Sequence, residues 1–461
     1  MRLEFDAIVV GAGQAGPSLA GRLTGAGMKV ALVERHLLGG TCVNTGCMPT
    51  KALVASAYAA HLSRRGADFG VVVEGAVKVD MKAVQQRAHK VTLDARAGLE
   101  KWLSGMEGLT LIRGHARFVG PGTMEVGDDT LTAPRIFLNV GGRAVEPGIP
   151  GAEVVETLTN SSILALDTLP EHLVVVGGGY VGLEFAQVFR RFGSKVTVVE
   201  KGPRLLSRED EDVSEAVREI LEAEGIAVRT DAECIHFSAL PNGVAVGMEC
   251  HTGEPEVMGS HVLVAVGRRP NTDDLGLDKT GIETNERGYI PVDDGLATTA
   301  DGVWAIGECN GRGAFTHTAF NDYEIVAANL LDGETRKVSE RVPGYAVFID
   351  PPLGRAGMTE TAARASGRKI LVSTRSMTRV GRAVEKSETK GFMKIIADAE
   401  TKEILGASIL GTGGDEAIHG ILDMMHAKQP YPVLQWAVPI HPTVSELIPT
   451  VLGGLKPPSN E

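Results

Sequence analysis

The sequence predicts an α/β protein made of two similar units of strand, glycine turn, helix and strand, followed by a separate α+β domain. Two observations predict the repeated unit, since a short apolar run ends in a glycine-rich turn at residues 11–16 and again at residues 177–182. The third observation is a change from about residue 340 onward, where apolar or alternating runs are separated by turn signals. A chain of 461 residues is also too long for one hydrophobic core, so several domains are expected.

The first unit begins with an apolar run at residues 7–10, which predicts a buried strand. The turn GAGQAG at 11–16 leads into a helical stretch that ends near Gly25, and a second apolar run at 30–33 ends in Glu34. This order indicates dinucleotide binding, because glycines let backbone N–H groups approach a pyrophosphate and the acid accepts hydrogen bonds from ribose hydroxyls. The candidate glycines are Gly11, Gly13 and Gly16.

The second unit repeats this pattern with an apolar run at 173–176, the turn GGGYVG at 177–182, and a run at 196–199 that ends in Glu200. The acid follows the first glycine of the turn by 23 positions in both copies, from 11 to 34 and from 177 to 200. One such turn alone is weak evidence, but its repetition predicts two dinucleotides held near one another. The candidate glycines here are Gly177, Gly179 and Gly182.

Later segments predict further elements around these units. Apolar runs end in glycine turns at 262–271 (VLVAVGRRPN) and 302–315 (GVWAIGECNGRGAF), as expected for strands that lead into cofactor loops. Apolar residues at helical spacing predict helices over about 78–103 and 413–427.

The composition excludes several classes of protein. No apolar run approaches the roughly 18 residues that a membrane-spanning helix needs. The formal net charge of −12 argues against nucleic-acid binding, which requires clustered Lys and Arg. The chain enters a strand-like run within a few residues of Met1, which leaves no room for a signal peptide, so we expect a cytoplasmic protein without a membrane partner.

The chain has few cysteines, and two of them are close in sequence. Their odd number does not suit the disulfide framework of a secreted protein, and one close pair in a cytosolic chain suggests redox or metal chemistry. The five cysteines are Cys42, Cys47, Cys234, Cys250 and Cys309.

Cys42 and Cys47 lie in the glycine-rich stretch GGTCVNTGC at 39–47. A disulfide needs Cα atoms roughly 4.4–6.8 Å apart, whereas positions i and i+5 of a regular α-helix lie about 8.7 Å apart. The chain must therefore turn and tighten between the cysteines, and the glycines and Asn44 permit this. We interpret the pair as redox-active, because a helix N-terminus lowers the pKa of a thiol.

Two alternatives give this pair no redox role. The cysteines could be two small buried hydrophobic residues, or they could bind a metal. A closed zinc site usually needs four ligands, and no second close pair of Cys or His accompanies these two, so no metal site is predicted.

The stretch GGTCVNTGCMPTK closely resembles the redox motif GGTCxNxGCxPSK of the flavoprotein disulfide reductases, the family of dihydrolipoamide dehydrogenase, glutathione reductase and mercuric reductase. The resemblance extends over almost the whole chain, through GGGYVGLEFA, VGRRPN, AIGEC, FIDPP and IHPTVSE. The order and spacing of these motifs are more specific than any one of them. The resemblance implies a homodimeric enzyme with two Rossmann-like dinucleotide-binding domains, for FAD and NAD(P), and a C-terminal α+β dimerisation domain.

The resemblance also divides the chain. Residues 1–148 are expected to form the first part of the FAD-binding domain and residues 271–338 its second part. Residues 149–270 are expected to form the NAD(P)-binding domain, and residues 339–461 the dimerisation domain.

The resemblance places the flavin beside the first unit. It implies that Glu34 meets the adenosine ribose of FAD and that Gly40 and Thr41 lie along the flavin phosphates. Cys47 resembles the family's thiolate beside the flavin, and Cys42 resembles the interchange thiol that attacks the substrate. Further cofactor-binding positions are Ala116, Glu308, Thr316 and Gly267.

Other positions resemble the family's catalytic groups. Lys51 and Glu184 match an ion pair near flavin N5, where a positive charge stabilises reduced flavin, and a surface salt bridge is the plainer alternative. Tyr180 matches an aromatic gate over the nicotinamide pocket, with core packing as its alternative. His441 and Glu446 match the catalytic pair, in which the histidine comes from the partner subunit, exchanges a proton with the dithiol and is oriented by the carboxylate.

The sequence departs from the family pattern at a few places. Glu308 follows Gly307 where the family usually has aspartate, and Asn139-Val140-Gly141 replaces the usual Ala-Thr-Gly. The chain has no C-terminal cysteine pair and keeps His441, which disfavours ordinary mercuric reduction. Glu200 favours NADH, because a carboxylate there repels the 2′-phosphate of NADPH.

The predicted function is FAD-dependent NAD(P)H:disulfide oxidoreduction through a Cys42–Cys47 disulfide, with dihydrolipoamide dehydrogenase as the nearest activity. The substrate is expected to be a small-molecule disulfide, dithiol or oxidant, and the active site is expected to be shared between subunits. One alternative is a metal-ion reductase for Hg(II) or Cu(II), related to mercuric reductase. Another is a flavin-bound redox sensor.

Overall fold

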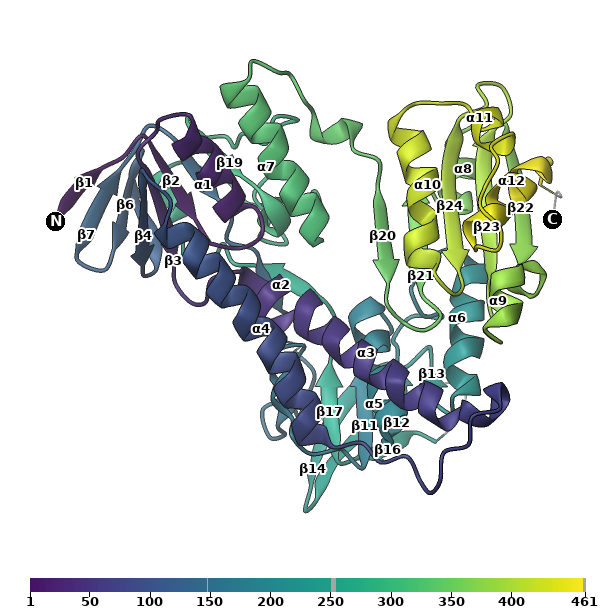
Figure 1. Cartoon of the computed structure of the whole chain (residues 1–461). Coiled ribbons are helices and arrows are strands. Elements are labelled where there is room, and N and C mark those ends of the chain that lie inside the picture. The colour runs from purple at the N-terminus through teal and green to yellow at the C-terminus, as the bar shows by residue number, and fades with distance from the viewer. Residues whose placement is uncertain (147, 250–253, 459–461) are drawn as a thin grey trace. The chain divides into compact units, whose positions relative to one another are not determined.

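The computed structural model describes residues 1–146, 148–249 and 254–458 (Figure 1). The chain divides into two compact units. The first unit contains Met1–Ala52, Ala83–Glu146 and Gly267–Arg341. The second contains Leu53–Lys82, Pro147–Val266 and Val342–Glu461.

A parallel sheet of five strands, in the order β19-β8-β2-β3-β4, forms the centre of the first unit. Its faces have different partners, because successive residues of a strand point to opposite sides. Val9 of β2 packs with residues of helices α1 and α7, whereas Ile8 packs with residues of an antiparallel sheet in the order β1-β7-β6-β5. A further antiparallel pair joins β9 to β18.

The elements of the first unit have the following bounds. The strands are β1 Arg2–Glu4, β2 Ala7–Val10, β3 Val30–Glu34, β4 Leu109–Arg113, β5 Ala116–Gly120, β6 Thr123–Val126, β7 Asp129–Thr132, β8 Ile136–Leu138, β9 Gly142–Ala144, β18 Arg268–Pro270 and β19 Val303–Ala305. The helices are α1 Gly16–Gly25, α2 Gly40–Thr45, α4 Met81–Ser104, α7 Thr316–Leu331 and α3 Cys47–Arg64, of which α3 ends in the second unit.

The second unit contains two larger sheets. A parallel sheet in the order β10-β17-β11-β12-β13 has one face packed against the three antiparallel strands β14-β15-β16, through Val174, Val246 and their neighbours. An antiparallel sheet in the order β20-β21-β24-β23-β22 belongs to the C-terminal part, where Ile395 and Ile409 pack against residues of helices α10 and α12. Figure 1 shows these helices along that sheet.

The elements of the second unit have the following bounds. The strands are β10 Thr157–Leu158, β11 His172–Val176, β12 Lys195–Val199, β13 Ala227–Arg229, β14 Glu233–Leu240, β15 Gly243–Glu249, β16 Glu256–Gly259, β17 His261–Val264, β20 Gly344–Val347, β21 Leu353–Gly357, β22 Ile370–Ser376, β23 Phe392–Asp398 and β24 Ile404–Leu410. The helices are α5 Tyr180–Phe192, α6 Glu211–Ala223, α8 Glu360–Ala365, α9 Gly381–Glu385, α10 Gly414–His426, α11 Pro432–Gln435 and α12 Ile448–Gly453.

The predicted fold class is confirmed. Both repeated units form the expected strand, turn, helix and parallel strand, and the C-terminal part forms an α+β lobe. The helices expected near 78–103 and 413–427 are α4 and α10. The division into four domain segments remains a prediction.

Candidate active site

The first glycine turn joins β2 to α1 and has no room for side chains at its two ends. Gly11 has a φ of +104°, and a Cβ atom there would collide with the carbonyl oxygen of Asn139. A Cβ atom at Gly16 would collide with the carbonyl oxygen of Gly11. At Gly13 an added Cβ would lie 3.3 Å from Nδ2 of Asn139. The turn therefore keeps its backbone open to a closely approaching phosphate.

Glu34, at the end of β3, is buried and is held by backbone donors. Its Oε2 accepts a hydrogen bond from the N–H of Ala12 at 2.8 Å, and its Oε1 accepts one from the N–H of His36 at 2.8 Å. A carboxylate has about four acceptor positions, so two remain for ribose hydroxyls. The turn and the acid together fit the adenosine diphosphate portion of a dinucleotide such as FAD.

The second glycine turn, between β11 and α5, repeats this geometry. Gly177 has a φ of +115°. Glu200 follows β12 and accepts hydrogen bonds from the N–H groups of Gly178, at 2.6 Å, and Gly202, at 2.7 Å. These donors have the same positions relative to turn and acid as the two donors in the first unit, so both units fit a dinucleotide in the same way.

Other predicted residues lie at the start of α5. Tyr180 is its first residue and is partly buried, and Gly179 before it is exposed. A Cβ atom at Gly182 would collide with the backbone of the glycine turn. Glu184, one turn further along, is buried and accepts a hydrogen bond from the N–H of Phe348 at 3.0 Å.

The redox stretch forms two helices, and the break between them lies between the two cysteines. Helix α2 carries Cys42, and α3 begins at Cys47. Gly46 separates them with φ −135° and ψ −122°, and a Cβ atom there would lie 2.8 Å from the carbonyl oxygen of Thr41. The expectation that no regular helix runs through both cysteines is therefore confirmed.

The start of α2 lies against the first glycine turn. Gly39 and Gly40 have φ values of +94° and +59°. A Cβ atom on Gly40 would lie 2.8 Å from Cα of Gly13. The Nδ2 of Asn44 donates to the carbonyl oxygen of Gly40 at 2.9 Å and fixes the start of the helix. This proximity supports the prediction that Gly40 and Thr41 lie along the phosphates of the same dinucleotide.

The two thiols of the pair differ in pKa. The pKa of Cys47 is lowered to about 5, mainly because the Cys42 thiol donates a hydrogen bond to its sulfur, with further lowering by the Thr316 hydroxyl and the Lys51 charge, while burial opposes the shift. The same hydrogen bond, together with burial, raises the pKa of Cys42. The Sγ of Cys47 lies 3.4 Å from Oγ1 of Thr316. Cys47 is therefore the thiolate at neutral pH and Cys42 the thiol.

Lys51 lies one turn after Cys47 on α3, where its ammonium charge favours the thiolate. Its predicted partner Glu184 belongs to the other compact unit. The ion pair between them remains a prediction.

The AIGEC stretch at residues 305–309, which we call the second flavin motif, is anchored to α7. The buried Asp322 of that helix accepts a hydrogen bond from the N–H of Gly307 at 2.8 Å. Glu308 forms an ion pair with Arg268, with 2.7 Å between Oε1 and Nε. Thr316 is the first residue of α7, so the positive end of the helix dipole lies beside the cysteine thiolate that Thr316 contacts.

Asn139 is a buried polar residue that the sequence did not identify as functional. Its Nδ2 donates to the carbonyl oxygen of Gly11 at 3.0 Å, and its Oδ1 would lie 3.2 Å from a Cβ atom added to Gly307. The side chain thus links the first glycine turn to the second flavin motif, and its departure from the family pattern was the available signal. Of the other predicted positions, Ala116 is buried at the start of β5, and Gly267 precedes β18 with φ +132°.

His441 and Glu446 are hydrogen-bonded in the second unit. Nδ1 of His441 lies 2.8 Å from Oε2 of Glu446. The N–H of Glu446 donates to Oγ1 of Thr443 at 3.2 Å, and the Thr443 hydroxyl donates to the carbonyl oxygen of Ile440 at 2.7 Å. The side chain of His441 is 81% exposed, so the ring is available to a group from outside this unit.

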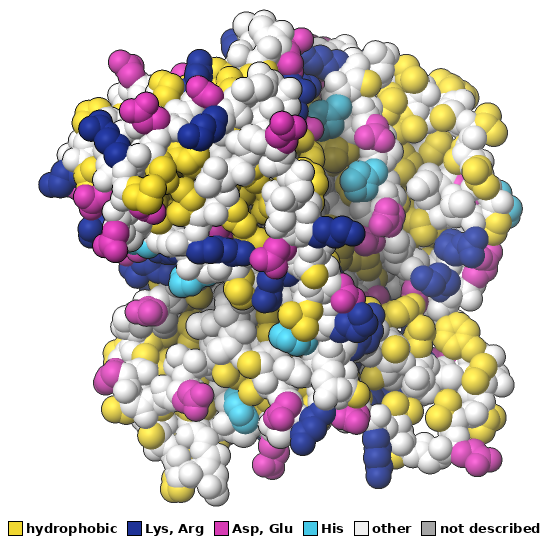
Figure 2. Space-filling view, turned by 60° about the vertical axis from the view of Figure 1, so that its left-hand side comes forward, with side chains coloured by type: hydrophobic (Ala, Val, Ile, Leu, Met, Phe, Trp, Pro, Cys, Tyr) yellow, Lys and Arg dark blue, Asp and Glu magenta, His cyan; other side chains and the backbone are white. Residues whose placement is uncertain are grey.

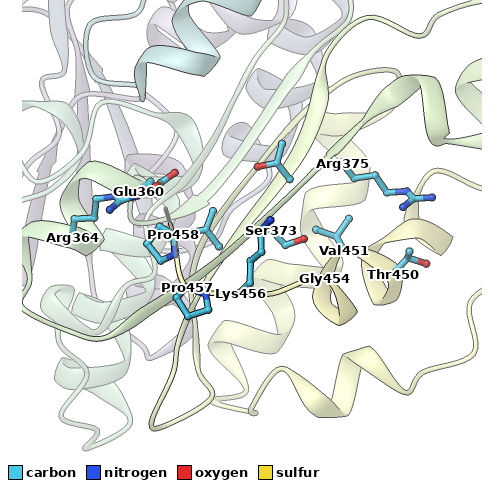
Figure 3. Close-up of a pocket in the computed structure, with 12 residues that line it drawn as sticks. Glu360, Arg364, Ser373, Arg375, Thr450, Val451, Gly454, Lys456, Pro457 and Pro458 are labelled. Atoms are coloured by element: carbon cyan, nitrogen blue, oxygen red, sulfur yellow. Dashed lines mark hydrogen bonds and ion pairs between the residues drawn. The ribbon is translucent and has the colours of Figure 1, made fainter. Parts of the chain in front are cut away.

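A cavity of about 450 Å³ lies elsewhere in the second unit, between β22, α12 and the C-terminal segment (Figure 3). Arg364, Ser373 and Lys456 are among its lining residues. It is lined by none of the predicted site residues. We do not assign the candidate active site to it.

The surface and the remaining residues add little to the site. Figure 2 shows Lys and Arg interspersed with Asp and Glu on one face. No helix in the described part of the chain is long and apolar enough to cross a membrane. Within residues 1–146, 148–249 and 254–458, no group of three or more His, Cys, Asp or Glu is arranged to hold a metal ion. Cys250 lies outside the described residues.

Comparisons with known proteins agree with this geometry. Residues 5–322 match the family model described as pyridine nucleotide-disulphide oxidoreductase, and residues 343–452 match its dimerisation domain. The chain is 36% identical over 452 residues to the probable pyridine nucleotide-disulfide oxidoreductase RclA of Escherichia coli, covering 96% of this chain and 97% of that protein. It is 33% identical to the dihydrolipoyl dehydrogenase of Thermus scotoductus, covering 96% and 95%. A solved structure, the Cu(II) complex of the HOCl-induced flavoprotein disulfide reductase RclA from Escherichia coli, matches with a TM-score of 0.89 at 35% identity, covering 98% of this chain and 99% of that one.

Proposed function

Because the chain belongs to the pyridine nucleotide-disulphide oxidoreductase family, we propose that it uses NAD(P)H to reduce an external disulfide through Cys42 and Cys47. Its cofactors are FAD and NAD(P)H. The observation that most directly supports the proposal is the pairing of a Cys47 thiolate with a Cys42 thiol beside Thr316. A cytoplasmic location is part of the proposal, since a reducing compartment suits a thiol pair that turns over.

Bound FAD supplies the relay of two electrons from the nicotinamide to the cysteine pair, and residues of this chain perform the disulfide exchange. His441 takes the proton of Cys42, whose sulfur attacks one sulfur of the substrate and displaces the other as a thiolate. The same histidine returns the proton to that leaving thiolate, while Glu446 holds the ring in one tautomer. Cys47 then attacks Cys42 and releases the second thiol, so one NAD(P)H and one proton are consumed for two thiols formed.

We propose that a second copy of the chain supplies the histidine. The residues before His441 expose a run of apolar side chains, with Trp436 80%, Val438 96% and Ile440 80% exposed. Exposed apolar surface of this kind marks a protein interface. The dimerisation-domain match covers the same segment, which supports a homodimer with a shared active site.

Steady-state assays of NAD(P)H oxidation test this function. We expect turnover with lipoamide, glutathione disulfide or another small disulfide, with two thiols formed for each nicotinamide oxidised. Lipoamide is the first substrate to test, because the dihydrolipoyl dehydrogenase match spans almost the whole chain. Negligible turnover of every disulfide, by protein that binds FAD, would contradict the proposal.

Reduction of Cu(II) is a second candidate, because a solved relative is a Cu(II) complex. In that reaction one NAD(P)H reduces two Cu(II) ions to Cu(I) and releases one proton. Cys42 and Cys47 would supply the thiolate ligands that favour Cu(I). Cu(II) turnover well above that of every disulfide would favour this candidate, and Hg(II) provides the comparison with a second thiophilic metal.

Glu200→Gln is expected to shift nucleotide preference from NADH towards NADPH. The carboxylate is fixed by Gly178 and Gly202 at the end of β12, where it accepts from the ribose of NADH and repels a 2′-phosphate. Glutamine keeps an acceptor for these N–H groups but removes the charge. We expect the kcat/KM for NADH divided by that for NADPH to fall by roughly 10–100-fold. This factor corresponds to the free energy of one charge-assisted hydrogen bond.

The matched control is Glu171→Gln, which removes an exposed carboxylate outside the predicted nucleotide site. It is expected to leave the ratio unchanged. Wild-type protein that already prefers NADPH would show this prediction to be wrong.

A further inference from the structure

Arg268 connects three segments that the sequence associates with the flavin. Its Nε and Nη2 bind the two carboxylate oxygens of Glu308, at 2.7 and 3.0 Å. Its Nη2 also donates to the carbonyl oxygen of Gly142 at 2.6 Å and lies 3.5 Å from Oγ1 of Thr41. One guanidinium group, at the start of β18, thus reaches the second flavin motif, the start of β9 and the redox helix α2, all in the first unit.

The longer acid at position 308 has a matching feature in Gly142. A Cβ atom on Gly142 would lie 2.8 Å from Cδ of Glu308 and 2.9 Å from its Oε1. The carboxylate therefore packs against the glycine backbone, and a side chain at 142 would displace it. Glutamate at 308 and glycine at 142 therefore fit each other, because the longer carboxylate occupies the space that a side chain at 142 would need.

The pair is also shielded from water. The side chains of Arg268 and Glu308 are 19% and 13% exposed. A two-point contact between guanidinium and carboxylate is directional as well as strong, and it loses little to solvent screening at this exposure. Arg268 uses one acceptor position on each oxygen, which leaves Glu308 able to accept a hydroxyl hydrogen bond.

We infer that Arg268 is a positioning residue for FAD, which holds the Glu308 carboxylate in place for a flavin hydroxyl and joins it to the start of α2. The inference rests on the proposed FAD site of the first unit. Arg268 itself acts through Glu308 and Thr41. An aspartate at 308 would be too short to keep both the arginine pair and the packing against Gly142.

FAD titration of three purified apoproteins tests this role. Arg268→Met keeps the apolar stem and removes the guanidinium group, and we expect FAD to bind about 10–100-fold more weakly, as for the loss of a charged hydrogen bond. Glu308→Asp is expected to weaken binding about tenfold by shortening the pair. Arg269→Met is the matched control, because Arg269 is the next residue of β18, is 48% exposed and forms a long ion pair with Asp273, at 3.7 Å.

A second readout separates positioning from general destabilisation. The visible circular dichroism of bound flavin, at saturating FAD, is expected to change in Arg268→Met and Glu308→Asp but not in Arg269→Met, while far-UV spectra of the three apoproteins stay alike. FAD binding by Arg268→Met within twofold of the Arg269→Met value would overturn the inference. If Arg268→Met does not fold, wild-type affinity in Glu308→Asp overturns it instead, and failure of wild-type protein to bind FAD would overturn the proposed function itself.

Discussion

Replacing Cys47 with serine is expected to abolish turnover of disulfides and of Cu(II), lowering kcat by at least about 10³-fold. Cys47 provides the low-pKa thiolate of the pair, and a serine hydroxyl does not ionise near neutral pH or form a disulfide. Cys42→Ser is expected to lose turnover to the same extent, because the attacking thiol is gone. The two variants should nevertheless differ in their spectra.

The difference follows from the cause of the low pKa. The largest contribution to the pKa of Cys47 is a hydrogen bond from Cys42, and a serine hydroxyl at position 42 can donate the same bond. The thiolate is therefore kept in Cys42→Ser and is expected to give long-wavelength thiolate-to-flavin absorbance. Because the pKa is lowered, this absorbance is present above about pH 5 and disappears as the pH falls through about 5.

Cys234→Ser is the matched control, because Cys234 is an exposed free cysteine on β14. It should keep both turnover and the wild-type spectrum. An absorbance in Cys42→Ser that titrates near the ordinary thiol value of 9.0 would show that the interpretation of the pair is wrong, as would full activity in Cys47→Ser.

The repeated units could be predicted from the sequence because their constraints are local. Gly11 and Gly177 need positive φ values, and Glu34 and Glu200 lie at a fixed distance along the chain from them. A strand, a tight turn and a helix determine that geometry within about 25 residues, so a motif is enough to find it. The break at Gly46 was predictable for the same reason, since the spacing of two cysteines excludes a regular helix.

The functional residues that could not be identified from the sequence depend on contacts between distant segments. Asn139 meets Gly11 from the end of β8, and Arg268 meets Glu308 and Gly142 from β18. Neither contact follows from the period of a helix or strand, because each joins residues more than 30 positions apart. The sequence indicated both residues only weakly. Asn139 departs from the usual Ala-Thr-Gly, and Arg268 lies inside the VGRRPN motif.

His441→Gln is expected to lower kcat for disulfide substrates by roughly 10²–10⁴-fold, the usual contribution of a general acid–base group. Nδ1 of His441 donates its hydrogen bond to Glu446, which leaves Nε2 of the ring as the group that exchanges a proton with the thiols. Glutamine can donate a hydrogen bond but cannot accept and return the proton. Reduction of Cu(II) requires no protonation of a leaving thiolate, and a Cu(II) ion that binds the Cys42 thiol itself displaces its proton, so the rate of this reaction should change far less.

The same variant therefore separates the two candidate functions. If the natural reaction is disulfide reduction, His441→Gln should convert a protein active on both substrate classes into one active mainly on Cu(II), and Glu446→Gln should show a smaller loss of the same kind. His419→Gln, which alters an exposed histidine of α10, is the matched control and should leave both rates unchanged. An equal loss of disulfide and Cu(II) turnover in His441→Gln would contradict proton transfer by this histidine. It would mean that His441 stabilises the folded dimer, because Cu(II) reduction needs no proton from the histidine and falls only if the whole protein is affected.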